Sequence, residues 1–474
     1  MTHFSTLSSL YIERWKKEKY QPSSSNVWTQ AIHTFLEEKR LQKSLLERCI
    51  SDQRSINNPW DHYLYLRDLL TLVMMVHPHE ETYRELFLAA YKKSVETAYS
   101  SHFQPTEAVR TLLHHFLHLK MDSSRPVLYP SGGAIADAKG FYSSFRVPSP
   151  RINTEMVVLW AMIGFIKKDT TYLEASIKLC HWHDKLLSKD RLPVLEVWES
   201  DTYSADEVLA SYALMYQSMR QLFLKEKWVD TEQQIFTAHT FNEISPFSFM
   251  LSYWMQFQKK EASLLIPEYE KVSDMDPFTG IVSHKGESLE GLFTMSGIHT
   301  SLGVLKKGDI KIVSMGPQSF PLSETKGFGI YNPCKMGPFS ISMQSEEGGC
   351  HVKGWVRLSS DPTWLKCSAT MEKEKCLLEM QIDPSGSKTA FAFYVKAESC
   401  MIGDRIFRPG SLEHYTGMAK PISFHNEAAK IQMLSSFFQN MHLIPLSGKD
   451  SFWGADFLVA YEAFPAEPYS IEIM

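Results

Sequence analysis

The stretch RINTEMVVLWAMIGFIKKDTTYLEASIKLCHWH, residues 151–183, predicts two helices joined by a short turn. Residues 153–167 carry almost no polar side chains after Glu155, so we expect this helix to be buried on most sides. The segment KKDTTY predicts the turn, and residues 170–187 have a clear polar face, as expected of a helix that covers the first one from outside. Alternation of buried and covering helices is what a barrel of helical hairpins requires.

Helical periodicity extends from the start of the chain to about residue 260. The predicted helices are residues 4–19, 27–50, 60–76, 80–99, 105–119, 153–167, 170–187, 204–224, 231–241 and 246–258. In the helix 204–224 the apolar residues fall on one stripe, formed by Ala205, Val208, Tyr212, Met215, Met219 and Leu222. The sequence shows no repeat of fixed length, which disfavours a solenoid of stacked repeats.

Beyond about residue 270 the pattern changes to short alternating runs separated by glycines. The predicted strands lie within residues 291–297, 301–316, 339–344, 350–360, 364–383, 389–397, 457–464 and 469–474. Lys307, Gly308 and Asp309 predict a hairpin turn between two of them. We therefore predict an α+β protein of two domains, with an α/α toroid-like array of paired helices over residues 1–265 and an antiparallel β-sandwich over residues 275–474.

Length, charge and cysteine content exclude several classes of protein. A chain of 474 residues is long enough for two domains, and a net charge of −5 without any Lys/Arg-rich run disfavours nucleic-acid binding. The seven scattered cysteines form no CxxC pair, which favours thiols in a reducing compartment over disulfides or a zinc site. The first residues lack a secretory signal, and the longest apolar run, residues 69–76, is too short to span a bilayer. We expect a cytoplasmic protein that does not bind a membrane.

A long loop precedes the apolar helix and is the first candidate for a binding site. Residues 129–152 are rich in Gly, Pro, Ser and aromatics, and loops of this length inside a domain are often functional. Arg146, Arg151, Asn153 and Glu155 gather where the loop becomes a helix, and helix N-termini favour anionic ligands. The alternative is a plain connection with two surface arginines.

A second candidate is the segment EVWESDTYSAD, residues 196–206. Trp198, Glu199, Asp201 and Tyr203 combine an aromatic platform, two carboxylates and a phenol, which suits the binding of a sugar ring. The alternative is structural, because Ser204 would cap the next helix and acidic residues stabilise helix N-termini.

The histidines offer a possible metal site. His114 and His118 are four residues apart on a predicted helix, and His181 and His183 form another close pair. A metal site needs three or four convergent ligands, and neither an HExxH motif nor a nearby acidic ligand is present. We therefore interpret them as structural histidines and predict no metal and no cofactor.

An array of paired helices followed by a large antiparallel β-region resembles the polysaccharide lyases of the heparinase II/III and chondroitin-lyase type. The residues that carry the resemblance are those of the hairpin 151–183, with Asn and Glu at the start of an inner helix, and no diagnostic motif matches. The resemblance implies an oligosaccharide or other anionic small molecule as ligand, bound in a cleft between the two domains.

For a lyase, the resemblance implies removal of the proton beside a uronate carboxylate. Arg146, Arg151 and Asn153 would stabilise the enolate-like charge, and Tyr203 or His183 would act as base and acid. A glycoside hydrolase would instead need two carboxylates across the cleft, for which Glu155 with Glu199 or Asp201 is available. A non-catalytic scaffold that binds carbohydrate or protein is the third alternative. Our site prediction has Asn153, Tyr203, Glu199 and Arg146 as catalytic residues, and Arg151, Glu155, Trp198, Asp201 and His183 as substrate-binding residues.

Overall fold

The structure is a computed structural model, and its contacts divide the chain into two compact units. It describes residues 27–38, 41–52, 56–57, 59–76, 83–96, 104–120, 125–128, 150–197, 202–223, 231, 233–235, 247–248, 250–251, 275–276, 281–294, 298–299, 301–319, 330–331, 342–346, 349–358, 364–382, 389–436, 440–448, 451–463 and 467–474. The first unit, called the helical unit below, comprises Met1–Ser143, Pro148–His181 and Asp206–Tyr269. The second, the β unit, comprises Ser144–Val147, Trp182–Ala205 and Glu270–Met474.

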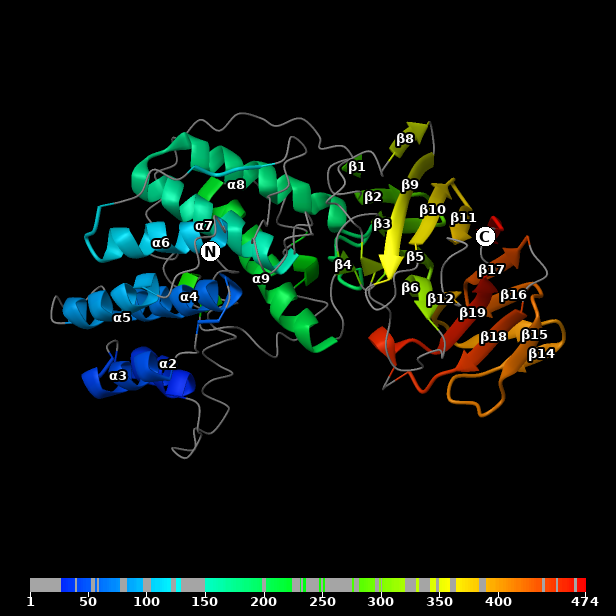
Figure 1. Cartoon of the computed structure of the whole chain (residues 1–474), viewed down its shortest axis with the longest axis horizontal. Coiled ribbons are helices and arrows are strands. Elements are labelled where there is room, and N and C mark those ends of the chain that lie inside the picture. The colour runs from blue at the N-terminus through cyan, green and yellow to red at the C-terminus, as the bar shows by residue number, and fades with distance from the viewer. Residues whose placement is uncertain are drawn as a thin grey trace. The chain divides into compact units, whose positions relative to one another are not determined.

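Eight α-helices lie in the described part of the chain (Figure 1). They are α2 (Val27–Glu38), α3 (Lys43–Ser51), α4 (Pro59–Val76), α5 (Arg84–Glu96), α6 (Gln104–Phe116), α7 (Pro150–Lys167), α8 (Thr170–His183) and α9 (Thr202–Phe223). The prediction of one helix over residues 27–50 was wrong, because the backbone is extended at Gln42 (φ −71°, ψ 143°) and α3 starts anew after it. The predicted helix 4–19 lies outside the described residues.

The helix α7 is buried as predicted. Every residue from Asn153 to Gly164 is shielded from solvent, and α7 packs against α6, which in turn packs against α4. A Cβ atom on Gly164 would come within 2.6 Å of Leu173 Cδ2, so glycine allows α7 and α8 to approach closely at their connecting turn.

The two neighbouring helices are more buried than the sequence predicted. Between Tyr172 and His183 the polar face of α8 is reduced to Glu174 and Lys178. In α9 the residues from Val208 to Met219 are buried on all sides, so the apolar surface is not a single stripe. None of the helices in the described ranges combines the length and apolarity needed to cross a bilayer.

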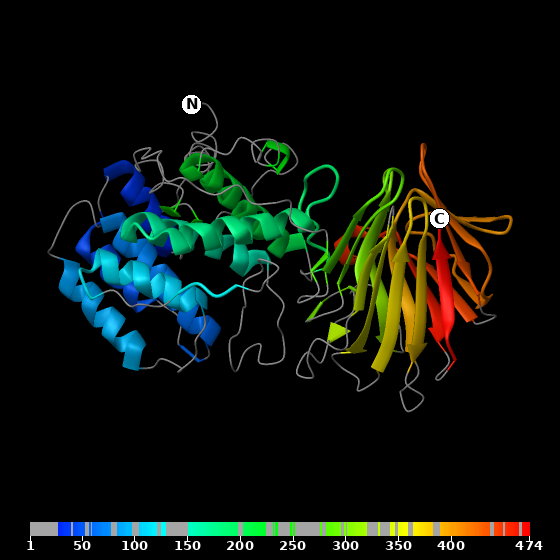
Figure 2. The same ribbon diagram turned by 90° about the horizontal axis from the view of Figure 1, so that it is seen from above.

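The β unit contains two antiparallel sheets. The first has the order β1-β2-β3-β5-β6-β12-β19-β18-β15, and the second has the order β14-β13-β16-β17-β20-β11-β10-β9-β7-β4, with β8 also paired to β9. The strands are β1 (Met275–Asp276), β2 (Ile281–Lys285), β3 (Glu290–Thr294), β4 (Ile298–His299), β5 (Gly303–Lys307), β6 (Ile310–Ser319), β7 (Ile330–Tyr331), β8 (Ser342–Glu346), β9 (Gly349–Leu358), β10 (Trp364–Met371), β11 (Cys376–Ile382), β12 (Thr389–Lys396), β13 (Ser399–Ile402), β14 (Arg405–Phe407), β15 (Tyr415–Met418), β16 (Ile422–His425), β17 (Lys430–Ser435), β18 (Asn440–Pro445), β19 (Phe457–Ala463) and β20 (Tyr469–Ile473). Figure 2 shows the helices α2 to α9 and the strands β1 to β20 in a second view.

Half of the twenty described strands overlap the runs predicted from the sequence, and the predicted hairpin turn is present. Lys307 pairs with Ile310, which leaves Gly308 and Asp309 as a two-residue turn with Gly308 at φ +57°. The predicted run 364–383 is itself a hairpin of β10 and β11. The other ten described strands were missed, and each has two to six residues: β1, β2, β4, β7 and the six strands from β13 to β18.

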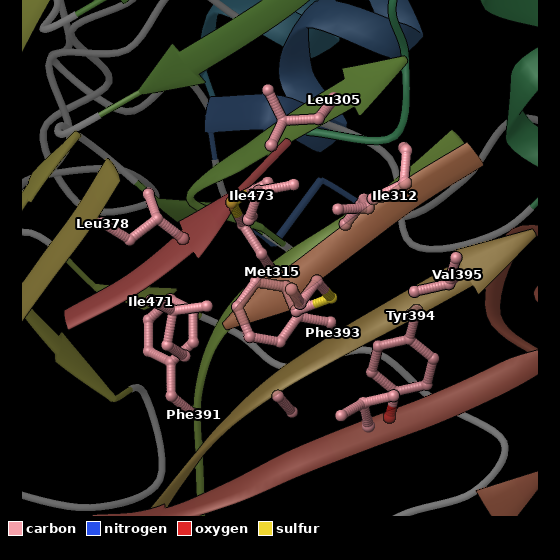
Figure 3. Close-up of a cluster of buried hydrophobic side chains, with 14 of the residues drawn as sticks. Leu305, Ile312, Met315, Leu378, Phe391, Phe393, Tyr394, Val395, Ile471 and Ile473 are labelled. Atoms are coloured by element: carbon pink, nitrogen blue, oxygen red, sulfur yellow. The ribbon is translucent and has the colours of Figure 1, made fainter. Parts of the chain in front are cut away.

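The two sheets contribute to one hydrophobic core. Phe391 and Phe393 of β12 lie in the core with Ile312 of β6, all from the first sheet, and Ile471 and Ile473 of β20 join them from the second (Figure 3). The ring centroids of Phe391 and Phe393 are 5.2 Å apart. Aromatic side chains of this kind supply much of the buried apolar area that stabilises a core.

Truncation of Phe393 should therefore destabilise the β unit strongly. Phe393 is fully buried, and replacement of it by alanine should lower the free energy of unfolding by about 3–5 kcal/mol through lost contacts and the cavity left behind. Calorimetry of the unfolding transitions measures the change. The control is Ile406→Ala, because Ile406 is 57% exposed and should change stability by about 0.5 kcal/mol or less. Equal effects of the two variants would contradict the described core.

The cysteines are protected thiols in the described part of the chain. Cys49, Cys180, Cys350, Cys367, Cys376 and Cys400 are all buried there. Burial raises the pKa of the Cys49 and Cys367 thiols to about 12, and the thiolate is the reactive form. We predict that a thiol reagent labels at most one cysteine of the folded chain, Cys334, and all seven after unfolding in denaturant. Rapid labelling of several thiols in the folded protein would contradict this burial.

Candidate functional site

The predicted site residues fall into three groups. Arg146, Trp198, Glu199 and Asp201 lie outside the described residues. Arg151, in the first turn of α7, and Tyr203, the second residue of α9, are described only by their backbone positions. The side chains of Asn153, Glu155 and His183 are described, and all three are buried.

The two helix starts differ slightly from the prediction. Helix α7 begins at Pro150, three residues early, and proline suits the first turn of a helix because its fixed φ is helical. Helix α9 begins at Thr202, so Ser204 lies inside the first turn rather than at the cap position predicted for it. Asn153 and Glu155 thus lie in the first two turns of α7, at 1% and 3% exposure.

The carboxylate of Glu155 is held by two residues of α4. Its Oε1 atom lies 3.1 Å from Arg67 Nη1, and its Oε2 atom accepts a hydrogen bond from the Tyr63 hydroxyl. Tyr63 and Arg67 are four residues apart, and this spacing puts both side chains on one face of α4. Both oxygens of Glu155 are therefore engaged inside the helical unit.

Aromatic rings and a second carboxylate also surround this buried ion pair, with Asp68 Oδ1 3.9 Å from Arg67 Nε. The Arg67 guanidinium lies over the Tyr63 ring at 5.9 Å and over the Phe247 ring at 5.5 Å. Cations are attracted to the faces of aromatic rings, particularly where water is excluded. Sequence reasoning missed Tyr63 and Arg67, although an arginine in the largely apolar run LYLRDLLTLVMMV was a signal for a buried partner.

His183 lies at the end of α8, in the part of the chain that belongs to the β unit. The neighbouring Trp182 donates its indole N–H to Asp276 Oδ2 of β1 at 2.7 Å, and both of these residues are fully buried. The rings of Trp182 and His183 meet edge to face at 5.1 Å. This packing holds the end of α8, from which the described residues 184–197 continue.

The histidines of α6 have structural contacts. His114 Nε2 lies 2.6 Å from the Tyr91 hydroxyl, and His114 Nδ1 lies 2.8 Å from the Lys120 carbonyl. His118 lies beyond the end of α6, where it is exposed and has a φ of +53°. The prediction that His114 and His118 share one helix face was therefore wrong. Among the residues that the structure describes, no three His, Cys, Asp or Glu side chains gather as a metal site would require.

Comparison with known proteins gives similarity at the level of structure. No protein-family model and no curated protein sequence matches the chain. The structure of a Paenibacillus xanthan lyase matches with a TM-score of 0.55 and 10% identity, over 100% of this chain and 54% of that one. A Streptomyces coelicolor chondroitin AC lyase matches with a TM-score of 0.49 and 8% identity, over 99% and 79% of the two chains.

These similarities concern the fold. This chain spans about half of the length of the xanthan lyase. At 10% identity the match extends to the arrangement of the backbone and leaves the identity of site residues open. The predicted fold-level resemblance to polysaccharide lyases is confirmed, and the chain has a lyase-like fold of helices followed by antiparallel sheets.

Proposed function

We propose that this protein acts on carbohydrate and cleaves a uronate-containing polysaccharide by β-elimination. The observation that carries the proposal is the fold shared with a xanthan lyase along the whole chain. A toroid-like arrangement of the helices and a sandwich of the two sheets are part of the proposal. Both belong to the lyase type that the sequence resembles.

In the proposed reaction, a base removes the proton on the carbon beside the uronate carboxylate. The electron pair forms a carbon–carbon double bond, and the glycosidic oxygen leaves with a proton supplied by an acid. Tyr203 is the proposed proton carrier, and the Asn153 amide is the proposed donor to the developing enolate, with Arg146 and Arg151 as countercharges. Asn153 lies in the first turn of α7, and an amide N–H is a donor of the kind that stabilises developing negative charge.

The contacts of Glu155 favour a lyase over a glycoside hydrolase. A hydrolase needs a carboxyl group that can protonate the leaving oxygen or activate water. Arg67 and Tyr63 occupy the two oxygens of Glu155, so this residue is a support for the start of α7 in our proposal. A glycoside hydrolase that uses Glu155 as one of its two catalytic carboxylates is therefore the weaker candidate.

Incubation of the protein with uronate polymers tests the proposal. Xanthan, chondroitin and heparan sulfate are suitable first substrates, with a neutral glucan as the control. The expected result is a rise in ultraviolet absorbance from the unsaturated product on at least one uronate polymer and none on the glucan. Binding without any rise in absorbance would contradict the lyase and favour the non-catalytic alternative.

A further inference from the structure

A short hairpin covers one face of the first sheet, within the β unit. It consists of residues 187–197, in which Leu187 and Pro193 form an antiparallel bridge and Arg191 turns the chain at φ +58°. The backbone N–H of Ser188 donates to the Leu192 carbonyl at 2.8 Å. Residues 187–197 are called the covering hairpin below.

Four charged residues form a row across the strands under the covering hairpin. The strand register places Lys285 opposite Glu290, Glu290 opposite Lys306, and Lys306 opposite Lys311. Successive residues of a strand point to opposite faces, and the neighbouring Leu305 belongs to the core. The row therefore lies on the face that points away from the core.

The row has an excess of positive charge that the covering hairpin offsets. Lys306 and Lys311 are directly opposite each other, and like charges in this arrangement repel. Asp190 of the hairpin pairs with Lys306, and Glu196 pairs with Lys311. Glu290 lies 3.7 Å from Lys306 and also accepts the Lys189 backbone N–H at 2.8 Å.

These ion pairs are partly open to solvent. The side chains of Lys306 and Asp190 are 32% and 58% exposed. Burial alone would lower the pKa of Lys306, but the hydrogen bonds and charges of Asp190 and Glu290 outweigh it and hold that pKa above its usual range. Lys306 is therefore a persistent cation within reach of a ligand.

A pocket of about 130 Å³ lies between the covering hairpin and the row. Its polar lining includes all four residues of the row, together with Asp190 and the hydroxyls of Ser188 and Ser283. Its apolar lining comes from both sides, with Leu187, Leu192, Pro193 and Val194 of the hairpin and Leu292 and Val304 of the sheet. The volume is below the roughly 300–1,000 Å³ of sites for drug-sized ligands, so it suits one small unit.

We propose that this pocket binds a single uronate sugar through Lys306 and Lys285. The ammonium groups match the sugar carboxylate, Glu290 and the serines match its hydroxyls, and the apolar residues match the face of its ring. The pocket lies wholly within the β unit, and its binding of sugar does not depend on the proposed catalysis.

Calorimetric titration of the full chain with free galacturonate tests the proposal. Galacturonate has no glycosidic bond to cleave, so binding is measured independently of turnover. We expect Lys306→Gln to weaken binding about tenfold, which corresponds to the loss of one charged contact. We expect Asp190→Asn to strengthen binding about threefold, because it removes a carboxylate that competes for Lys306.

A matched control and two further ligands complete the test. Lys307→Gln changes the next lysine on β5, which does not line the pocket, and should leave binding unchanged. Glucose and inorganic sulfate should each bind more weakly than galacturonate. Unchanged binding in folded Lys306→Gln, weaker binding in Asp190→Asn, or equal binding of sulfate or glucose would each overturn the proposal. The melting temperature of each variant establishes that it is folded.

Discussion

Replacing Arg67 by methionine is expected to lower the free energy of unfolding of the helical unit by about 3–5 kcal/mol. Glu155 is 3% exposed, and removal of Arg67 leaves its charge in the interior with the Tyr63 hydroxyl as its remaining described hydrogen-bond donor. A buried charge without its counter-ion is far more costly than the intact pair is stabilising. Urea unfolding followed by far-ultraviolet circular dichroism measures the loss, because the described helices of this unit dominate that signal.

Two further variants separate the buried charge from other effects. The double variant Arg67→Met with Glu155→Gln removes both charges but keeps an acceptor for Tyr63, and should recover at least about half of the loss. The control is Lys43→Met, which breaks the exposed Lys43–Glu47 pair at 4.0 Å and should cost about 0.5 kcal/mol or less. If Arg67→Met lowered the free energy of unfolding no more than Lys43→Met does, the described ion pair between Arg67 and Glu155 would be contradicted.

Replacing Tyr203 by phenylalanine is expected to lower kcat by about 10²–10⁴-fold on any polymer that the protein cleaves. The variant removes only the hydroxyl group that we propose as proton carrier, and it keeps the ring. Substrate binding, measured as KM or by titration with the polymer, should change little. Initial rates of product absorbance at saturating substrate provide the measurement.

The control for Tyr203 lies on the same helix. Tyr216 is also in α9 and is fully buried, so Tyr216→Phe removes the same group from a position without a proposed role in chemistry. It should leave kcat within about twofold of the wild type and reduce stability by about 1–3 kcal/mol. A loss of kcat in Tyr216→Phe as large as in Tyr203→Phe would assign both effects to folding.

Local patterns in the sequence were sufficient to predict the helices α4 to α9 and half of the described strands. The continuous apolar run after Glu155 predicted the buried helix α7, and the alternating runs predicted strands such as β9 and β12. The break between α2 and α3 was missed, because the helical pattern continues through residues 39–42. Short strands such as β14, with only three residues, give too little periodicity to detect.

The contacts around the candidate site depend on pairings that a single sequence does not contain. Arg67 and Glu155 are 88 residues apart, and only the packing of α4 and α7 in the helical unit brings their charges together. The row of charged residues under the covering hairpin depends on the register of four paired strands. A shift by one residue would turn Lys306 to the other face of the sheet. The sequence did identify Asn153 and Glu155 as neighbours at the start of α7, and their catalytic or binding roles stay a prediction.

The mass of the products released from a uronate polymer tests the central claim most directly. Elimination creates a new non-reducing end that is lighter by one water molecule than the end created by hydrolysis. We predict that mass spectrometry detects this lighter, unsaturated end with the wild-type protein, and that it is strongly reduced with Tyr203→Phe. Fragments that carry the full water, or a polymer left intact by a protein that binds it, would contradict the assignment as a lyase.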